Sequence, residues 1–181
     1  MQLGRILEEF YTRDGQKVIF RTPKYEDLVD ILELINSLID EKTGIARSIK
    51  VTKGEAIEWL NKMLAKLDNE EVFFLAAEVN NKVISLSDIN IVSRNENYNG
   101  IIGIAVKKGF RGLGIGTEIV KILVEQAKLL ELKNLELRIF ATNEREIFFY
   151  KKRGFIQTDI IPKRPEYDIY VDELVLTKSI D

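Results

Sequence analysis

The sequence predicts an α/β protein built on a mixed central sheet. Three observations predict it. Segments with helical spacing of apolar residues alternate with short β-type segments. Two of the β-type segments are joined by the tight-turn pair Asn80-Asn81. Other neighbouring strands are separated by helices, so hairpin-linked and helix-linked pairing should occur in one sheet. With 181 residues, 45% of them hydrophobic, the chain suits a single domain, residues 1–181.

The elements follow the order β-α-α-β-β-β-α-β-α-β-β. The stretch LGRILEEFY can form a short helix, so residues 1–15 are expected to be an N-terminal helical extension. Apolar residues at helical spacing predict two helices, one carrying Leu28, Ile31 and Ile35 and one carrying Leu60 and Leu64. A third helix runs to about residue 130, and a fourth is closed by a glycine that suits a helix end. The predicted strands are 17–22, 71–79, 82–92, 101–106, 134–140, 155–162 and 168–178.

Cysteine and histidine are both absent from the chain. No disulfide, Cys or His nucleophile, Ser-His triad or ordinary zinc site can be built, so no metal is expected. Acid–base chemistry must therefore use carboxylates, Lys, Tyr, backbone or water. The net charge of −2 argues against a general nucleic-acid binder. Without an apolar membrane-spanning run or a signal peptide, no membrane partner and a cytoplasmic location are expected. Abundant Ile, Lys and Glu with few Met also fit a thermophile's composition.

The stretch FRGLGIGTEIV holds three alternating glycines between a buried strand and a helix. A Walker loop requires Lys directly after its last Gly, and a dinucleotide fingerprint requires G-x-G-x-x-G after a first strand; neither matches. The remaining interpretations are a tight strand-to-helix turn without a ligand, or a pyrophosphate site. In the second, backbone N–H groups and the helix dipole bind the anion, and Arg111 adds a charge at the rim.

The same region resembles the GNAT superfamily of N-acetyltransferases. GIAVKKGFRGLGIGTEIV is similar to the acetyl-CoA motif Q/R-x-x-G-x-G/A, with Arg111, Gly114 and Gly116 at the signature positions and Gly112 at a variable one. ATNEREIFFYKKRGF resembles the second motif of the family, and DELVLTK its last strand. The resemblance covers roughly residues 17–178 and is most specific from 101 to 155.

The resemblance implies a sheet that splays apart between the fourth and fifth strands, residues 101–106 and 134–140, with acetyl-CoA as cosubstrate in the gap. Backbone groups of the first of these strands would bind the pantetheine arm, and those of the glycine loop the pyrophosphate. The cofactor-binding residues expected on this basis are Ile104, Ala105, Val106, Arg111, Gly112, Leu113, Gly114, Ile115, Gly116 and Thr117.

Asn143 and Tyr150 lie seven residues apart, so they fall on nearly the same face of one helix. Asn143 can be an N-cap, a cofactor contact or both. Tyr150 can be a core residue with its hydroxyl at the edge. The resemblance implies instead that its phenol is the general acid that protonates the departing CoA thiolate.

The implied reaction is direct attack by a primary amine of a small molecule, amino acid or protein on the acetyl thioester. Many family members carry a Glu base where this chain has Gly103. The candidate substitutes are Asp88, Glu96, Glu78 and Asp172.

This departure leaves open a non-catalytic acyl-CoA-binding or sensing module, and a purely structural domain is the third alternative. The resemblance implies an acceptor site near 36–52 and 159–168, where Asp40 and Glu41 can attract a cationic amine or simply be a solvated helix end. The oligomeric state stays open, and edge strands near the C-terminus are compatible with a homodimer.

Overall fold

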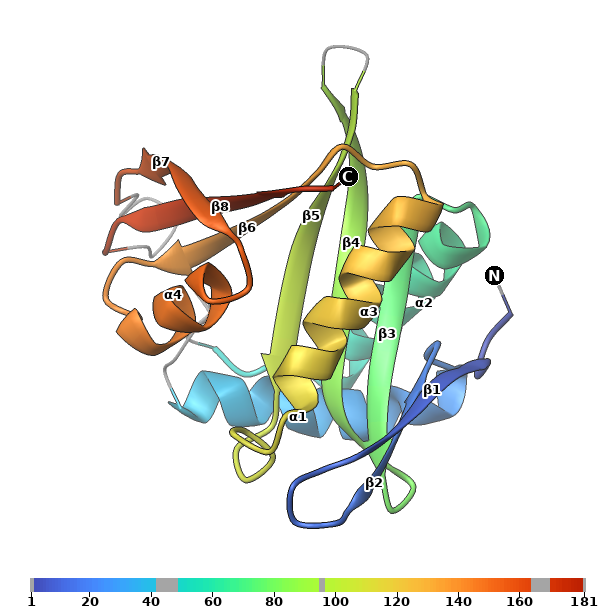
Figure 1. Ribbon diagram of the computed structural model, residues 1–181. Helices are drawn as coiled ribbons and strands as arrows, with labels where there is room; N and C mark the ends of the chain where they lie inside the picture. The colour runs from blue at the N-terminus through green and yellow to red at the C-terminus, as the bar shows by residue number, and fades with distance from the viewer. Residues whose placement is uncertain (1, 42–48, 95–96, 164–169, 181) are drawn as a thin grey trace.

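The computed structural model describes residues 2–41, 49–94, 97–163 and 170–180. Within them, eight strands form one sheet in the order β1-β2-β3-β4-β5-β6-β8-β7 (Figure 1). The strands are β1 Ile6–Tyr11, β2 Lys17–Arg21, β3 Val72–Val79, β4 Lys82–Arg94, β5 Asn97–Val106, β6 Asn134–Phe140, β7 Ile156–Ile161 and β8 Glu173–Ser179. The helices are the 3-10 turn η1 Tyr25–Asp27, α1 Leu28–Glu41, α2 Lys53–Asp68, α3 Ile115–Leu129 and α4 Glu144–Lys151. The predicted α/β class and element order are therefore confirmed from β2 onward.

The N-terminal segment is where the prediction was wrong. The expected helix is strand β1, which pairs antiparallel with β2 in a hairpin. The turn is closed by Thr12, whose hydroxyl accepts from the Gln16 amide at 2.8 Å. Phe10 packs on Phe20 at a ring-centroid distance of 6.3 Å. Pairing with β2 gives the segment ladder hydrogen bonds and a buried aromatic contact, which an isolated surface helix of this length would lack.

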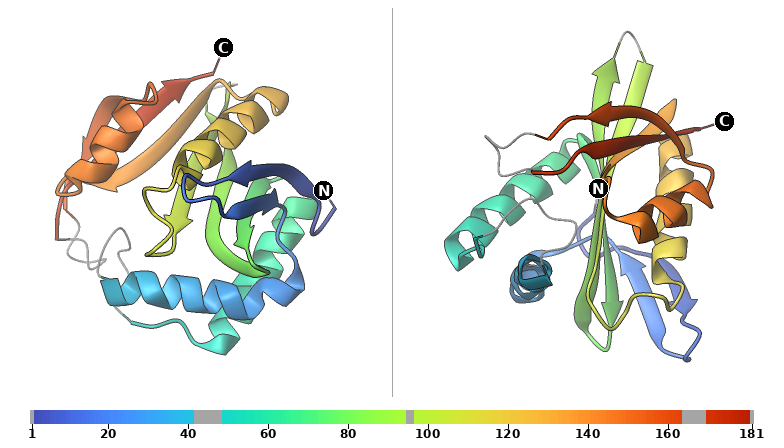
Figure 2. Two further views of the ribbon diagram at one scale, coloured as in Figure 1. Left: turned by 60° about the horizontal axis from the view of Figure 1, so that its bottom comes forward. Right: turned by 90° about the vertical axis from the view of Figure 1, so that its left-hand side faces the viewer.

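Helices cover both faces of the sheet (Figure 2). On one face, α1 and α2 bury Leu34, Leu38 and Leu60 against a cluster that includes Phe74. On the other face, α3 belongs to the larger core cluster and buries Ile119 and other apolar residues there, while Tyr150 of α4 packs into the same cluster. None of the described helices is long and apolar enough to span a membrane.

A buried ion-pair network fixes the start of the α1 layer. Arg21 on β2 donates to both carboxylate oxygens of Asp27, at 2.7 and 2.8 Å, and to Glu78 on β3 at 2.8 Å. Asp27 also accepts from the Lys24 amide at 2.9 Å, which closes the turn before α1. Since breaking one partner would leave a buried charge, this network ties the helix to the sheet.

The sheet opens between β5 and β6. On one side, β5 pairs with β4 over residues 97–106. On the other, it pairs in parallel with β6 only from Asn99↔Asn134 to Ile101↔Glu136, and the two strands then diverge (Figure 1). Strand β6 continues to pair with β8 along its other edge. The predicted splay is confirmed, and it leaves one edge of residues 102–106 without a neighbouring strand in the described structure.

Candidate active site

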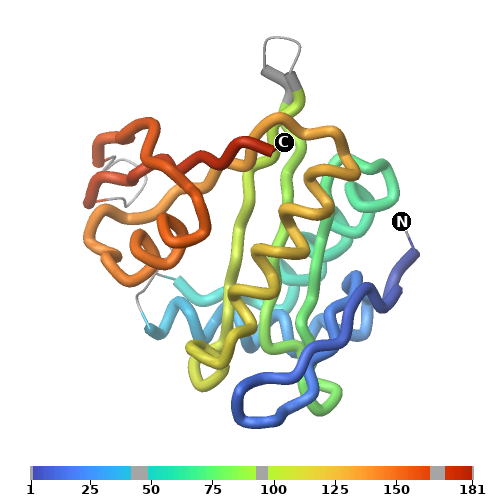
Figure 3. The backbone as a smooth tube through the Cα atoms, viewed as in Figure 1, coloured from blue at the N-terminus to red at the C-terminus, as the bar shows by residue number. Residues whose placement is uncertain are grey.

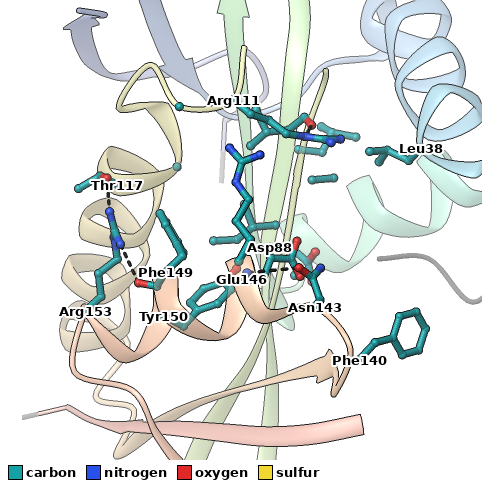
Figure 4. A pocket seen from close by; sticks show the side chains of 18 of the residues that line it. Leu38, Asp88, Arg111, Thr117, Phe140, Asn143, Glu146, Phe149, Tyr150 and Arg153 are labelled. Atoms are coloured by element: carbon teal, nitrogen blue, oxygen red, sulfur yellow. Dashed lines mark hydrogen bonds between the residues drawn. The ribbon is translucent and has the colours of Figure 1, made fainter. Parts of the chain in front are cut away.

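A cavity of about 760 Å³ lies at the opening between β5 and β6. Its lining comes from both faces of the sheet: from the glycine loop, α3 and α4 on one face, and from α1 and α2 on the other. Figure 4 shows Thr117 and Arg153 at one end, Leu38 and Phe140 at the other, and Asp88 and Glu146 between them. The cavity therefore passes through the gap and reaches both faces of the sheet.

The glycine loop, residues 107–114, joins β5 to α3 (Figure 3), and Thr117 in the first turn of α3 lies at one end of the cavity (Figure 4). Gly114 is the N-cap of α3 with φ 98°, and Gly112 has φ 82°, so both positions favour glycine. The position that the motif treats as variable, Gly112, is therefore constrained by its backbone. Among the described residues, the amides of 111–116 donate to no other group, whereas the Thr117 amide donates to the Gly114 carbonyl at 2.9 Å. The set of amides predicted to bind an anion is therefore reduced to those of residues 111–116.

Arg111 is directed away from these free amides. Its Nε donates to the Val106 carbonyl at 2.8 Å, and its Nη1 pairs with Glu41 at the end of α1 at 2.6 Å. From the sequence, Arg111 was predicted to supply charge to the pyrophosphate, and Glu41 was interpreted either as attracting a cationic amine or as part of a solvated helix end. In the structure the two charges neutralise each other, and Asp40 pairs with Lys50 at 2.9 Å. Neither acid is thus an uncompensated charge for an acceptor.

Arg153 is a cation at the start of α3 that was not predicted from the sequence. Its Nη2 donates to the Thr117 hydroxyl, and its Nη1 donates to the Phe149 carbonyl at 2.7 Å. The guanidinium carbon lies 3.5 Å from the centre of the Phe149 ring, and the buried Nε has no partner in the described structure. A cation beside the positive end of a helix is unfavourable by itself, but together the two attract an anion.

The open edge of β5 follows from the ladder with β4. Lys107 donates its amide to the Ile84 carbonyl at 2.9 Å. In an antiparallel ladder the hydrogen-bonded residues alternate, so Ala105 directs its backbone groups to β4, whereas Ile104 and Val106 direct theirs to the gap. The predicted backbone contacts therefore narrow to Ile104 and Val106, and Ala105 lines the cavity by its side chain.

Helix α4 brings Asn143 and Tyr150 to the cavity, as their spacing predicted. Asn143 is an N-cap whose Oδ1 accepts from the Glu146 amide at 3.3 Å, which confirms the capping role. Tyr150 is 7% exposed and contacts Phe149 and Phe155 edge-on, at centroid distances of 5.0 and 5.5 Å. Burial raises the pKa of the Tyr150 phenol, Glu146 raises it further, and Arg153 lowers it. The phenol therefore stays protonated at neutral pH and can donate a proton.

Asp88 on β4 occupies the space beside Gly103 on β5. The two residues are cross-strand partners, and a Cβ built on Gly103 would lie 2.9 Å from Asp88 Oδ1. Asn90 donates its side-chain amide to the other carboxylate oxygen. Burial raises the pKa of the Asp88 carboxyl to about 7. A carboxylate thus stands over the position where the chain has glycine, with a pKa that suits a base at neutral pH.

The other candidate bases lie elsewhere. Glu78 is held by Arg21, and Asp172 accepts from the Lys163 amide at 2.9 Å near the start of β8; neither lines the cavity. Glu96 lies outside the described residues. Glu146, which the sequence analysis did not consider, faces the cavity, and burial raises its pKa against the opposing charges of Arg111 and Arg145.

Comparison with known proteins supplies the family. The profile of the Acetyltransferase (GNAT) family matches residues 32–155, which is more than half of the chain. The chain belongs to the GNAT family. The matched segment contains β5, the glycine loop, α3 and α4, so it includes both motifs on which the resemblance was based.

One curated relative and two solved structures are similar to this chain. The uncharacterized N-acetyltransferase MJ1207 of Methanocaldococcus jannaschii is 36% identical over 107 residues, or 57% of this chain and 46% of that protein. The chain therefore spans about half the length of this curated relative. The ribosomal-protein-S5-alanine acetyltransferase from Vibrio fischeri has the same fold, with a TM-score of 0.81 at 17% identity over 97% of this chain and 98% of that one. The microcin C7 self-immunity acetyltransferase MccE, solved with acetyl-CoA and AMP, gives a TM-score of 0.77 at 16% identity over 90% and 92% of the two chains.

Proposed function

We propose that this GNAT protein transfers the acetyl group of acetyl-CoA to a primary amine, with Asp88 as general base and Tyr150 as general acid. The observation that carries the proposal is the Asp88 carboxylate beside Gly103, on the sheet face that leads to the gap. A base at this position compensates for the glycine that made a non-catalytic module an alternative.

The described residues suit acetyl-CoA, which supplies the acetyl thioester when bound. The unpaired amides before Thr117, the N-terminus of α3 and the unpartnered Nε of Arg153 favour a pyrophosphate. The gap-facing N–H groups of Ile104 and Val106 offer donors to an amide-containing arm, and the Ile104 carbonyl offers an acceptor, whereas the Val106 carbonyl already accepts from Arg111 Nε. One such N–H can also stabilise the negative charge that develops on the thioester oxygen during attack.

The two side chains divide the proton transfers. Asp88 takes a proton from the incoming ammonium, because only the neutral amine has a lone pair for attack. As the nitrogen–carbon bond forms and the carbon–sulfur bond breaks, Tyr150 donates its proton to the sulfur. The proton that the nitrogen then loses restores the phenol, and Asp88 releases its own to solvent. The products are the amide, the free thiol and one proton per ammonium consumed.

Thiol release from acetyl-CoA across a panel of primary amines tests the proposal. We expect turnover by the parent, and a loss of about 10²-fold or more in kcat for both Asp88→Asn and Tyr150→Phe, since positioned acid–base groups contribute at least this much. Calorimetry should show CoA affinity within about twofold of the parent for both variants, because neither side chain is assigned to the pyrophosphate. Asp172→Asn is the matched control and should retain parental kcat.

Two results would contradict the proposal. Tight CoA binding without turnover of any amine would favour the acyl-CoA-binding module instead. Parental kcat in Asp88→Asn would place the base elsewhere, with Glu146 the next side chain to replace.

The outer strand β7 supports a homodimer, which the sequence left open. Its Ile156 and Ile160 are 66% and 50% exposed, and its outer edge, which has no neighbouring strand among the described residues, can pair with a second copy. Light scattering during size-exclusion chromatography should give the mass of two chains, and Ile160→Lys should give the mass of one. A parent that elutes with the mass of one chain rules the homodimer out.

A further inference from the structure

The half of the cavity beyond Asp88 has an apolar wall on the α1/α2 face of the sheet. It is formed by Ile35, Leu38, Trp59, Phe74, Leu86 and Phe140. We propose that the acceptor is a primary amine carried on an apolar group, and that this wall binds that group while Asp88 receives the amine. The inference rests on the proposed function and names its substrate class.

The sheet register places the wall directly beside the base. Phe74, Asp88 and Gly103 form one cross-strand row, so their side-chain positions lie on the same face. The next row along the strands is Ala76, Leu86 and Ala105. Phe74 and Leu86 belong to the cluster that packs under α1 and α2, so Asp88 also faces that side. An amine at Asp88 therefore has its substituent against apolar side chains.

Aromatic groups give this wall its shape. Trp59 of α2 meets Phe74 edge-on, at a centroid distance of 5.5 Å and an angle of 82°. Trp59 is only half-buried, although the neighbouring Leu60 is 2% exposed. Figure 4 places Phe140 and Leu38 at the end of the cavity that lies away from Thr117 and Arg153. The wall therefore offers aromatic surface from Trp59, Phe74 and Phe140 to the substituent of the amine.

The charges around the cavity disfavour a second ionic group on the acceptor. The two acids that could attract a cationic amine are paired, Asp40 with Lys50 and Glu41 with Arg111. Among the cations of the described lining, Arg13 belongs to the hairpin whose backbone contacts the glycine loop, and Arg153 lies at the start of α3. Arg111 is bound to Glu41, and the charge of Arg145 acts on Glu146. No lining side chain of the described apolar wall carries a charge that would compensate a carboxylate or a second ammonium.

Three amines that differ only in the group beyond the nitrogen provide the test. These are 2-phenylethylamine, phenylalanine, which adds a carboxylate, and putrescine, which replaces the ring with a second ammonium. We expect kcat/KM for 2-phenylethylamine to exceed that of each other amine at least about 10-fold, as an apolar pocket rejects a charge more strongly than a missing methylene. Preference for putrescine or phenylalanine overturns the inference while the proposed function stands. No turnover with all three amines and with the wider panel overturns the proposed function, and the inference falls with it.

Variants of the wall make the test specific. Trp59→Ala should raise KM for 2-phenylethylamine about 10-fold, with kcat for the bound amine and CoA affinity nearly unchanged. Ile57→Ala on the same helix is the control, because Ile57 is 40% exposed and lies outside the lining; it should leave KM unchanged. Phe140→Asp tests the wall independently of Trp59. It should raise kcat/KM for putrescine relative to that for 2-phenylethylamine by at least about 10-fold. Unchanged amine preference in both wall variants would refute the assignment.

Discussion

Adding one methyl group at Gly103 tests the central contact of the site. In Gly103→Ala the new Cβ would lie 2.9 Å from Asp88 Oδ1, where ordinary contacts begin near 3.4 Å. The carboxylate must therefore retreat by about 0.5 Å or more to restore van der Waals contact. Strand pairing holds both backbones, and Asn90 holds the other carboxylate oxygen, so the side chain has to leave its rotamer.

The magnitude follows from this displacement. Overpacking of this kind costs about 1–3 kcal/mol of folding stability. Displacing a catalytic group by a fraction of an ångström to 1 Å costs about 10- to 100-fold in rate. We expect kcat to fall by about that factor with the best amine of the panel, while CoA affinity stays within about twofold because the methyl points to the acceptor face.

The assay is a double-mutant cycle with Asp88→Ala, followed by thiol release and by denaturant unfolding. Since Asp88→Ala removes the atom that the methyl would strike, Gly103→Ala should cost little stability and little further kcat in that background. A stability cost that is equal in both backgrounds would refute the steric reasoning. A single Gly103→Ala variant with parental kcat would refute the role of Asp88 at this position.

Three further predictions concern the same cavity. Because the pKa of Asp88 is raised to about 7, kcat/KM should rise with pH through about 7, and Asp88→Asn should abolish that rise. The folded protein keeps the Asp88 proton at pH values where an unfolded Asp has lost it. The unfolding free energy of the parent should therefore fall by up to about 4 kcal/mol between pH 4 and 7. Denaturant titrations should show no such fall in Asp88→Asn. Arg153→Gln should weaken CoA binding about 10-fold by calorimetry, because it removes about one charged hydrogen bond to the phosphate. The control Lys152→Gln should leave the affinity unchanged. Equal affinities of both variants would show that Arg153 does not bind the phosphate.

The local parts of this fold were readable from the sequence, and the non-local parts were not. The glycine loop and α4 are continuous segments whose turn residues and spacing predict their form. The prediction for LGRILEEFY failed because Leu3, Ile6, Leu7 and Phe10 recur at helical spacing although the segment forms a strand. Only pairing with β2 decides between them, and a pairing partner is not visible in the segment itself.

The same distinction separates the site residues. Tyr150 and Asn143 were found because one helix carries both. Asp88 could be named only as one of four acids, because its place beside Gly103 depends on the register between two strands. Arg153 was missed because its contact with Thr117 depends on how α4 packs against α3, although the KKR run that contains it was visible.

The cross-strand row of Phe74, Asp88 and Gly103 links the base to the choice of acceptor. Burial is the cause that raises the pKa of Asp88, and Phe74 in the same row, 1% exposed, is part of that burial. A more polar wall would admit water and lower this pKa, which would make the carboxylate a weaker base. In the proposed mechanism an apolar wall would therefore have two effects: it would keep the pKa of the base matched to neutral pH, and it would favour amines whose substituent is apolar. The carboxylate on β4 also needs space at the opposite position on β5, so Gly103 would contribute to the proposed catalysis by lacking a side chain.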